Sequence, residues 1–126
     1  MKRFMTSLLM ALTIGTTAAV AQTDSEGKYT LKNGNMTMTI DAAKGAKILS
    51  LKCGDKEVIS QMKWPETYGS TFWTSPQKEW YWPPVPEYDK KPYQVEEADG
   101  VLKMTSEVSE KLKYRICKEF KVDETT

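Results

Sequence analysis

The chain has 126 residues, with 18 Lys and Arg against 17 Asp and Glu, no His and two Cys. That length accommodates one domain, and the balanced charge gives no reason to expect nucleic acid or an anionic membrane surface as a partner. The absence of His excludes a Ser-His-Asp triad, a Cys-His pair and a His-ligated zinc site. Two Cys are too few for a four-cysteine metal site. The sequence therefore predicts neither a metal site nor a cofactor.

Residues 1–21 have the pattern of a secretory signal peptide. Lys2 and Arg3 give a positive start, residues 8–14 form a short apolar run, and residues 19–21 (Ala-Val-Ala) form a small-residue cleavage site. The alternative is an uncleaved membrane anchor, but the apolar run is far shorter than the roughly 20 residues that span a bilayer. We expect cleavage after Ala21, a periplasmic or secreted location and no stable membrane insertion of the mature protein.

Residues 22–27 are polar and are expected to be disordered. From residue 28 onward the apolar residues alternate with polar ones, which is typical of half-buried strands. Tyr29 and Leu31 belong to the first expected strand, and the turn dipeptide Asn33-Gly34 leads to a second with Met36, Met38 and Ile40. After residues 41–45, a third expected strand contains Ile48, Leu49 and Leu51, and Gly54-Asp55 closes a hairpin into residues 56–59. This part of the chain is predicted to be antiparallel β-sheet.

The C-terminal third also has the period of a strand. An Asp99-Gly100 turn precedes an apolar stretch at 101–104, and the even positions from 112 to 122 are apolar except at Lys118. We expect a strand over 112–122 and a polar connection before it. The predicted fold class is all-β, an antiparallel β-sandwich over residues 28–126.

The middle of the chain, residues 64–93, is rich in aromatic residues and holds all six prolines. Proline cannot pair within a central strand, and a loop of this length inside a compact domain is usually functional. The density of rings favours an ordered segment.

This loop supplies the candidate site. A sugar ring stacks on the flat faces of aromatic side chains while carboxylates accept its hydroxyl groups. The candidate carbohydrate-binding residues are Trp73, Glu79, Trp80, Tyr81 and Trp82. The alternative is that the rings seal the core, since aromatic side chains bury a large apolar area. Nothing in the spacing of Glu79 and Glu87 indicates a catalytic acid/base pair, so no catalytic residue is predicted.

Cys53 and Cys117 form an even pair in a chain with an export signal, so a disulfide between them is permitted. Two free thiols are the alternative, because the sequence does not bring the two positions together.

Several segments together resemble a known fold family. The runs at 29–40, 44–51 and 54–58 resemble the opening strands of galactose-mutarotase-like supersandwich domains. The run at 68–84 (Tyr-Gly-Ser-Thr-Phe-Trp-Thr-Ser-Pro-Gln-Lys-Glu-Trp-Tyr-Trp-Pro-Pro) is similar to a motif of a secreted bacterial family with that fold. The resemblance implies carbohydrate binding and an incomplete, N-terminal part of a longer domain. The mutarotases use a His acid and a Glu base, and because this chain has no His, no catalytic residue carries over.

The expected function is therefore an exported carbohydrate-binding protein. Two alternatives stay open: a structural or adhesive surface module that uses the aromatic loop as a protein interface, and the N-terminal half of an enzyme similar to sugar epimerases.

Overall fold

The computed structural model describes residues 21–62 and 67–123. Regular structure in these ranges is mostly antiparallel strand, with only one turn of 3₁₀ helix at Gln77–Glu79 and one of α-helix at Pro86–Asp89. The predicted all-β class is thus confirmed. The expected signal peptide, apart from Ala21, and residues 64–66 of the aromatic loop lie outside the described residues.

The first sheet has five strands in sequential order. They are β1 (Gln22–Thr23), β2 (Lys28–Asn33), β3 (Met36–Asp41), β4 (Lys47–Cys53) and β5 (Lys56–Glu57). Two-residue turns connect β2 to β3 and β4 to β5, each with a glycine at its first position: Gly34 at φ 57° and Gly54 at φ 58°. Glycine takes this left-handed backbone without steric cost, and such turns match the twist of the strands. Both predicted turns are confirmed.

The second sheet has three antiparallel strands in the order β6-β7-β8. They are β6 (Gln94–Ala98), β7 (Val101–Thr105) and β8 (Cys117–Lys121). The Asp99-Gly100 turn between β6 and β7 has both residues in the left-handed region, at φ 53° and 73°. This is the conformation for which the Asp-Gly dipeptide is selected in hairpins, and the prediction of a turn here is confirmed.

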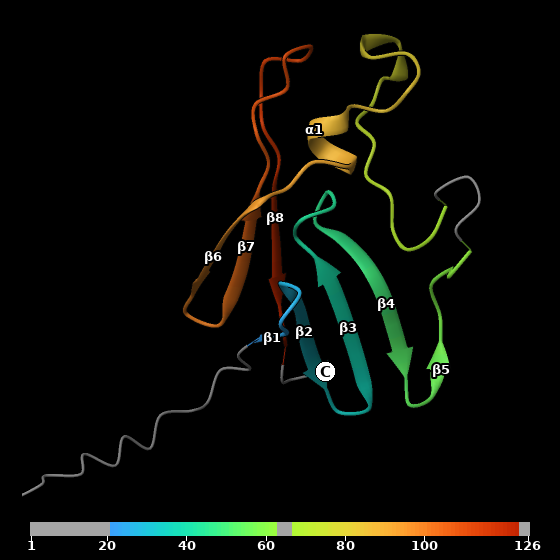
Figure 1. Ribbon diagram of the computed structural model, residues 1–126, viewed down its shortest axis with the longest axis vertical. Coiled ribbons are helices and arrows are strands. Elements are labelled where there is room, and N and C mark those ends of the chain that lie inside the picture. The colour runs from blue at the N-terminus through green and yellow to red at the C-terminus, as the bar shows by residue number, and fades with distance from the viewer. Residues whose placement is uncertain (1–20, 63–66, 124–126) are drawn as a thin grey trace, which may run out of the picture.

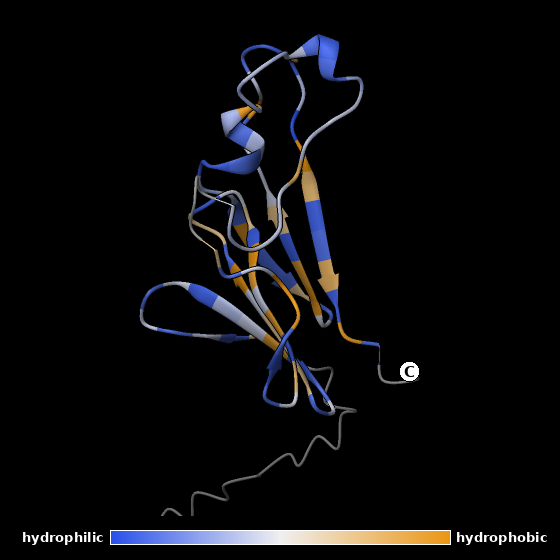
Figure 2. Ribbon diagram, turned by 90° about the vertical axis from the view of Figure 1, so that its right-hand side faces the viewer, coloured by the Kyte–Doolittle hydropathy of each residue, from blue (hydrophilic) through white to orange (hydrophobic). Residues whose placement is uncertain are grey.

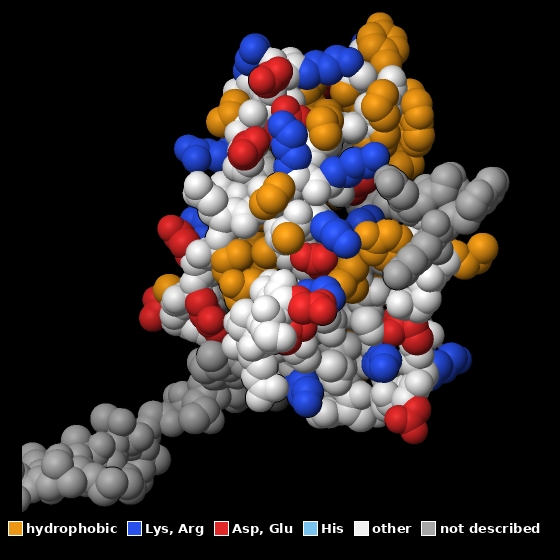
Figure 3. Space-filling view, viewed as in Figure 1, with side chains coloured by type: hydrophobic (Ala, Val, Ile, Leu, Met, Phe, Trp, Pro, Cys, Tyr) orange, Lys and Arg blue, Asp and Glu red, His pale blue; other side chains and the backbone are white. Residues whose placement is uncertain are grey.

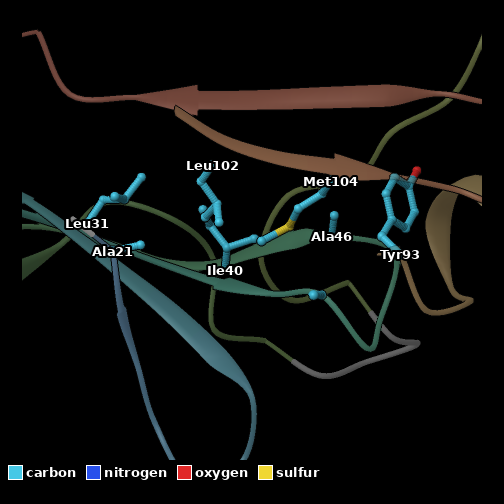
Figure 4. Packing of buried hydrophobic residues seen from close by; sticks show 8 residues of the cluster. Ala21, Leu31, Ile40, Ala46, Tyr93, Leu102 and Met104 are labelled. Atoms are coloured by element: carbon cyan, nitrogen blue, oxygen red, sulfur yellow. The ribbon is translucent and has the colours of Figure 1, made fainter. Parts of the chain in front are cut away.

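The two sheets share one apolar core (Figure 1). Figure 4 shows Leu102 and Met104 of β7 pointing toward Ile40 of β3, with Leu31 and Tyr93 at either end of the row. Ile40 and Met104 are fully buried. Hydrophobic and hydrophilic residues alternate along the strands in Figure 2 because one face of each sheet packs on this core.

Two connections extend above the sheets in Figure 1. One is the aromatic segment, residues 67–93, which contains α1 (Pro86–Asp89); the other is the hairpin loop, residues 106–116, between β7 and β8. They pack against each other around a second, smaller core of Trp80, Val85 and Tyr88, flanked by Phe72, Leu112 and Ile116. The aromatic segment is therefore an ordered part of the molecule.

In residues 22–27, β1 pairs with β2, and the Asp24 carboxylate accepts backbone hydrogen bonds from Glu26 and Lys28, both at 2.9 Å; the disorder expected there stays a prediction. One sequence-based expectation needs correction. The strand expected over 112–122 begins only at Cys117. Before it, the Ser109 hydroxyl accepts the backbone N–H groups of Lys111 and Leu112 at 3.2 and 3.1 Å, which closes a turn in place of a strand.

Candidate functional site: an aromatic surface beside a shallow groove

The structure separates the four predicted rings into one buried and three exposed. Trp80 is 3% exposed, whereas Trp73, Tyr81 and Trp82 are 51%, 68% and 69% exposed. We call these three the aromatic surface. Figure 3 shows hydrophobic side chains gathered at the top right of the molecule, where Figure 1 draws the segment between β5 and α1. Exposed aromatic rings of this kind are unusual unless they meet a ligand or a partner.

Trp80 supports this surface from below. Its indole N–H donates to the backbone carbonyl of Thr74 at 2.9 Å, which satisfies its one polar group inside the small core. The alternative considered for the rings, that they seal a core, is therefore what the structure shows for Trp80. With 3% of its surface exposed, Trp80 offers a ligand little of its ring.

The exposed tryptophans are held by contacts between their rings. Trp73 meets Trp80 edge-on, with centroids 6.2 Å apart, and meets Trp82 at 5.8 Å and 90°. Such perpendicular pairs contribute about 0.5–1.5 kcal/mol beyond the area that they bury. The three indoles thus form a continuous array that starts at the small core and ends at the exposed ring of Trp82.

Tyr81 is held by a different set of contacts. Its backbone lies in the left-handed region at φ 60°, and its N–H donates to the carbonyl of Gln77 at 2.7 Å. The Lys111 ammonium lies 5.5 Å from the centre of the Tyr81 ring and donates a hydrogen bond to the Trp80 carbonyl. A lysine of the hairpin loop therefore fixes the turn that exposes Tyr81.

A shallow groove of about 290 Å³ lies beside Trp82. One wall is formed by the aromatic segment and the other by the hairpin loop. The lining residues are Trp80, Trp82, Pro83, Val85, Pro86, Glu87, Glu110 and Lys111. The groove joins an apolar, ring-bearing wall to two carboxylates, which is the combination that sugar recognition requires.

Glu87 is the buried acid of the groove, at 6% exposure. One of its oxygens accepts the backbone N–H of Glu110 at 3.4 Å and lies 3.8 Å from the Lys91 ammonium. The Lys91 ammonium is shared, because it also lies 3.7 Å from Glu107. These are long contacts for a buried carboxylate.

α1 fixes the position of Glu87 and joins the two connections. Tyr88 is 1% exposed, and its hydroxyl donates to the Tyr114 carbonyl of the hairpin loop at 2.6 Å. Burial raises the pKa of the Tyr88 hydroxyl, so the group remains a donor throughout the neutral range. The Tyr93 hydroxyl donates to the Tyr88 carbonyl, also at 2.6 Å.

The aromatic segment is anchored to the sheets at one junction. The Phe72 N–H donates to the Asp89 carboxylate at 3.0 Å, and the Gly45 N–H donates to the Lys91 carbonyl at 2.9 Å. Lys118 of β8 reaches the same place: its ammonium donates to the Gly45 carbonyl at 2.8 Å and lies 4.9 Å from the centre of the Phe72 ring. These contacts hold the aromatic segment, which carries the site, against both sheets.

The remaining predicted site residues lie elsewhere. Glu79 is exposed at the end of the 3₁₀ turn and does not line the groove. Cys53 and Cys117 are free and exposed, on β4 of one sheet and β8 of the other, so the permitted disulfide is not formed.

Sequence analysis missed Glu110 and Lys111, because these residues line the groove only through the fold of the hairpin loop. Across residues 21–62 and 67–123, no three acidic or cysteine side chains gather as a set that could bind a metal ion. In the same part of the chain, no helix has the length and hydropathy to cross a membrane.

Comparison with known proteins gives no relative on which a function could be based. No family model matches the chain, and neither the curated proteins nor the solved structures contain a match. A function for this protein is therefore inferred from the geometry of the site alone.

Proposed function

We propose that this protein is an exported carbohydrate-binding protein whose site is the aromatic surface together with the groove beside Trp82. The observation that carries the proposal is the exposure of Trp82 next to two carboxylates on an ordered platform. A sugar ring would stack its apolar face on the Trp82 indole. Its hydroxyl groups would donate to Glu87 and Glu110.

The rings of the proposed site are already ordered before a ligand binds. Ordering a flexible side chain on binding costs about 0.5–1.5 kcal/mol, and the contacts between Trp73, Trp80 and Trp82 order these rings during folding. The open, shallow shape of the groove favours an extended oligosaccharide over a fully enclosed monosaccharide. The proposal concerns binding alone.

The architecture that we propose with this function is a β-sandwich of the galactose-mutarotase-like type. Its support is the packing of a five-stranded and a three-stranded antiparallel sheet on one core, and the order of the opening strands. The proposed sugar site lies in the connections above the sheets and not on a sheet face.

The test is tryptophan fluorescence titrated with a panel of oligosaccharides. We expect quenching by at least one member, and a loss of about fivefold or more in affinity in Trp82→Ala, because stacking of a nucleic-acid base on an aromatic side chain is worth about 1–3 kcal/mol and a sugar ring stacked on the indole should contribute on the same order. Val108→Ala is the control, since Val108 is an exposed hydrophobic residue of the hairpin loop that does not line this groove. It should leave the affinity unchanged.

A folded sample that shows no quenching with the whole panel would contradict the proposal. If the same sample self-associates, and Trp82→Ala makes it monomeric, the aromatic surface is a protein interface, which is the competing function.

The proposal of export depends on residues 1–21. Ala21 itself is packed in the sheet core, and its N–H donates to the Glu97 carboxylate at 3.1 Å. Intact mass of the protein recovered from a bacterial periplasm should correspond to a chain that begins at Gln22; a mass that includes residues 1–20 would contradict cleavage.

A further inference from the structure

The polar groups of the groove are not electrically balanced. Its lining contains two acidic residues, Glu87 and Glu110, and one basic residue, Lys111. The Lys91 ammonium lies 3.8 Å from Glu87 but is shared with Glu107, 3.7 Å away, so these three carboxylates and two ammonium groups leave one negative charge. A ligand that enters the groove would therefore meet an excess of negative charge beside an indole ring.

The ammonium of Lys111 is already engaged within the protein. It donates to the Trp80 carbonyl and lies over the Tyr81 ring at 5.5 Å, so its position is set by the turn that it stabilises. It neither contacts Glu87 nor forms an ion pair with Glu110 in the described part of the chain. Lys111 thus does little to neutralise the two acids.

The carboxylate of Glu87 retains binding capacity toward the groove. Two contacts of this buried group, 3.4 Å to the Glu110 N–H and 3.8 Å to the Lys91 ammonium, both involve the same oxygen, Oε1. A carboxylate can accept about four hydrogen bonds, and a buried one gains most from a charged donor. Glu110 is exposed on the opposite wall, and its backbone N–H lies 3.4 Å from the Glu87 carboxylate, so the two acidic residues are neighbours across the groove.

The ring wall favours the same kind of ligand. Trp82 presents an exposed indole, and cations are attracted to indole faces more strongly than to other aromatic rings. A sugar that carries an ammonium group would combine stacking with charge. Its ring would lie on Trp82 and its ammonium would lie between Glu87 and Glu110.

We propose that the groove selects amino sugars, namely oligosaccharides of glucosamine with free ammonium groups, over neutral sugars of the same size. This inference rests on the proposed carbohydrate-binding function and specifies its ligand class. It predicts that affinity depends on the charge of the ligand, while stacking supplies the part of the affinity that all sugars share.

The experiment compares three tetramers with the same β-1,4 linkage: glucosamine, N-acetylglucosamine and glucose. Tryptophan fluorescence should show the glucosamine tetramer binding about fivefold more tightly than the glucose tetramer at low salt, as expected for one partly exposed ion pair. The preference should decline at high salt, because screening weakens exposed charge pairs.

Variants locate the charge that matters. Glu110→Gln and Glu87→Gln should each weaken binding of the glucosamine tetramer by a larger factor than binding of the glucose tetramer, because the amide keeps an acceptor oxygen for a sugar hydroxyl but loses the negative charge. Glu79→Gln is the matched control, because Glu79 is an exposed acid of the same segment that lies outside the groove. Glu110 is exposed, so its variant is expected to fold even if substitution of the buried Glu87 disturbs the hairpin loop.

The possible outcomes separate the two proposals. Equal affinity for the three tetramers, or tighter binding of the acetylated one, overturns the preference for amino sugars and leaves the carbohydrate-binding function standing. A preference that persists in Glu110→Gln and in a folded Glu87→Gln also overturns it, since the charge would then act elsewhere. No binding of any tetramer or of the wider panel contradicts the carbohydrate-binding function itself.

Discussion

At the residue scale, Lys118 is a polar residue in an otherwise apolar row, and it connects β8 to the aromatic segment. It interrupts the row of even-numbered apolar residues in the C-terminal strand, and it lies opposite the buried Met104 in the register of β7 and β8. Its ammonium lies between the rings of Phe72 and Tyr93, at 4.9 and 5.1 Å from their centres. The exception in the sequence pattern is therefore a link between a sheet and the aromatic segment.

The surroundings of Lys118 give a prediction about pH. Burial lowers the pKa of Lys118 from 10.5 to about 8, against the opposing attraction of Asp89, while Lys47 adds to the lowering. Between about pH 8 and 10.5 the unfolded chain binds this proton and the folded protein has released it, so the free energy of unfolding rises with pH in that window. Urea denaturation at a series of pH values should show this rise.

The control for this prediction removes the titrating group. Lys118→Met should lack the rise, and Lys103→Met, which replaces an exposed lysine of β7, should retain it. A wild-type protein whose stability is constant or falls between pH 8 and 9.5 would show that the ammonium is not buried as described.

At the element scale, the junction between the β3–β4 turn and α1 decides whether the aromatic segment is held in place. Gly45 has φ 70°, and a Cβ atom built on it would lie 2.3 Å from the carbonyl oxygen of Asp89, the last residue of α1. The close approach of two backbones therefore requires glycine at this position.

Gly45→Ala should destabilise the protein by about 2–4 kcal/mol, as the sum of left-handed backbone strain and a backbone clash. Gly34→Ala is the control: Gly34 has φ 57°, but nothing lies within 4 Å of its added Cβ. It should cost about 1–2 kcal/mol from backbone strain alone. Thermal unfolding followed by circular dichroism measures both, and equal losses would argue against the close approach at Gly45.

The sequence predicted elements well where local chemistry determines them. The Asn33-Gly34, Gly54-Asp55 and Asp99-Gly100 dipeptides mark the three tight hairpin turns, and the alternating pattern of 36–41 marks β3. β6 was missed because Gln94–Ala98 has little apolar character; it is an edge strand whose pairing with β7 is set by the turn that follows it.

The site was predicted only in part, for a physical reason. The sequence identified the rings but could not tell that Trp80 is buried and Trp82 exposed, since both belong to one Trp-Tyr-Trp run. The difference arises from the left-handed backbone of Tyr81 and from Lys111, which belongs to a distant part of the chain. Long-range contacts of this kind leave no local pattern.

At the scale of the whole molecule, the protein has two regions, each built around its own hydrophobic core. The sheets and their shared core provide stability, while the aromatic segment and the hairpin loop form a second core that carries exposed rings. This division explains how Pro-rich sequence can be ordered without joining a sheet: the prolines among residues 67–93 lie in connections or at the start of α1, where no ladder hydrogen bond is lost.

The central claim is that the exposed rings bind a ligand while the buried one supports them. The most direct measurement is NMR of the indole N–H groups in ¹⁵N-labelled protein, assigned with single Trp→Phe variants and titrated with the oligosaccharide panel. We predict that the resonances of Trp82 and Trp73 shift on binding, and that the resonance of Trp80, whose N–H is bonded to the Thr74 carbonyl, stays in place. Unchanged Trp82 and Trp73 resonances at saturating oligosaccharide, or a shift confined to Trp80, would contradict the account.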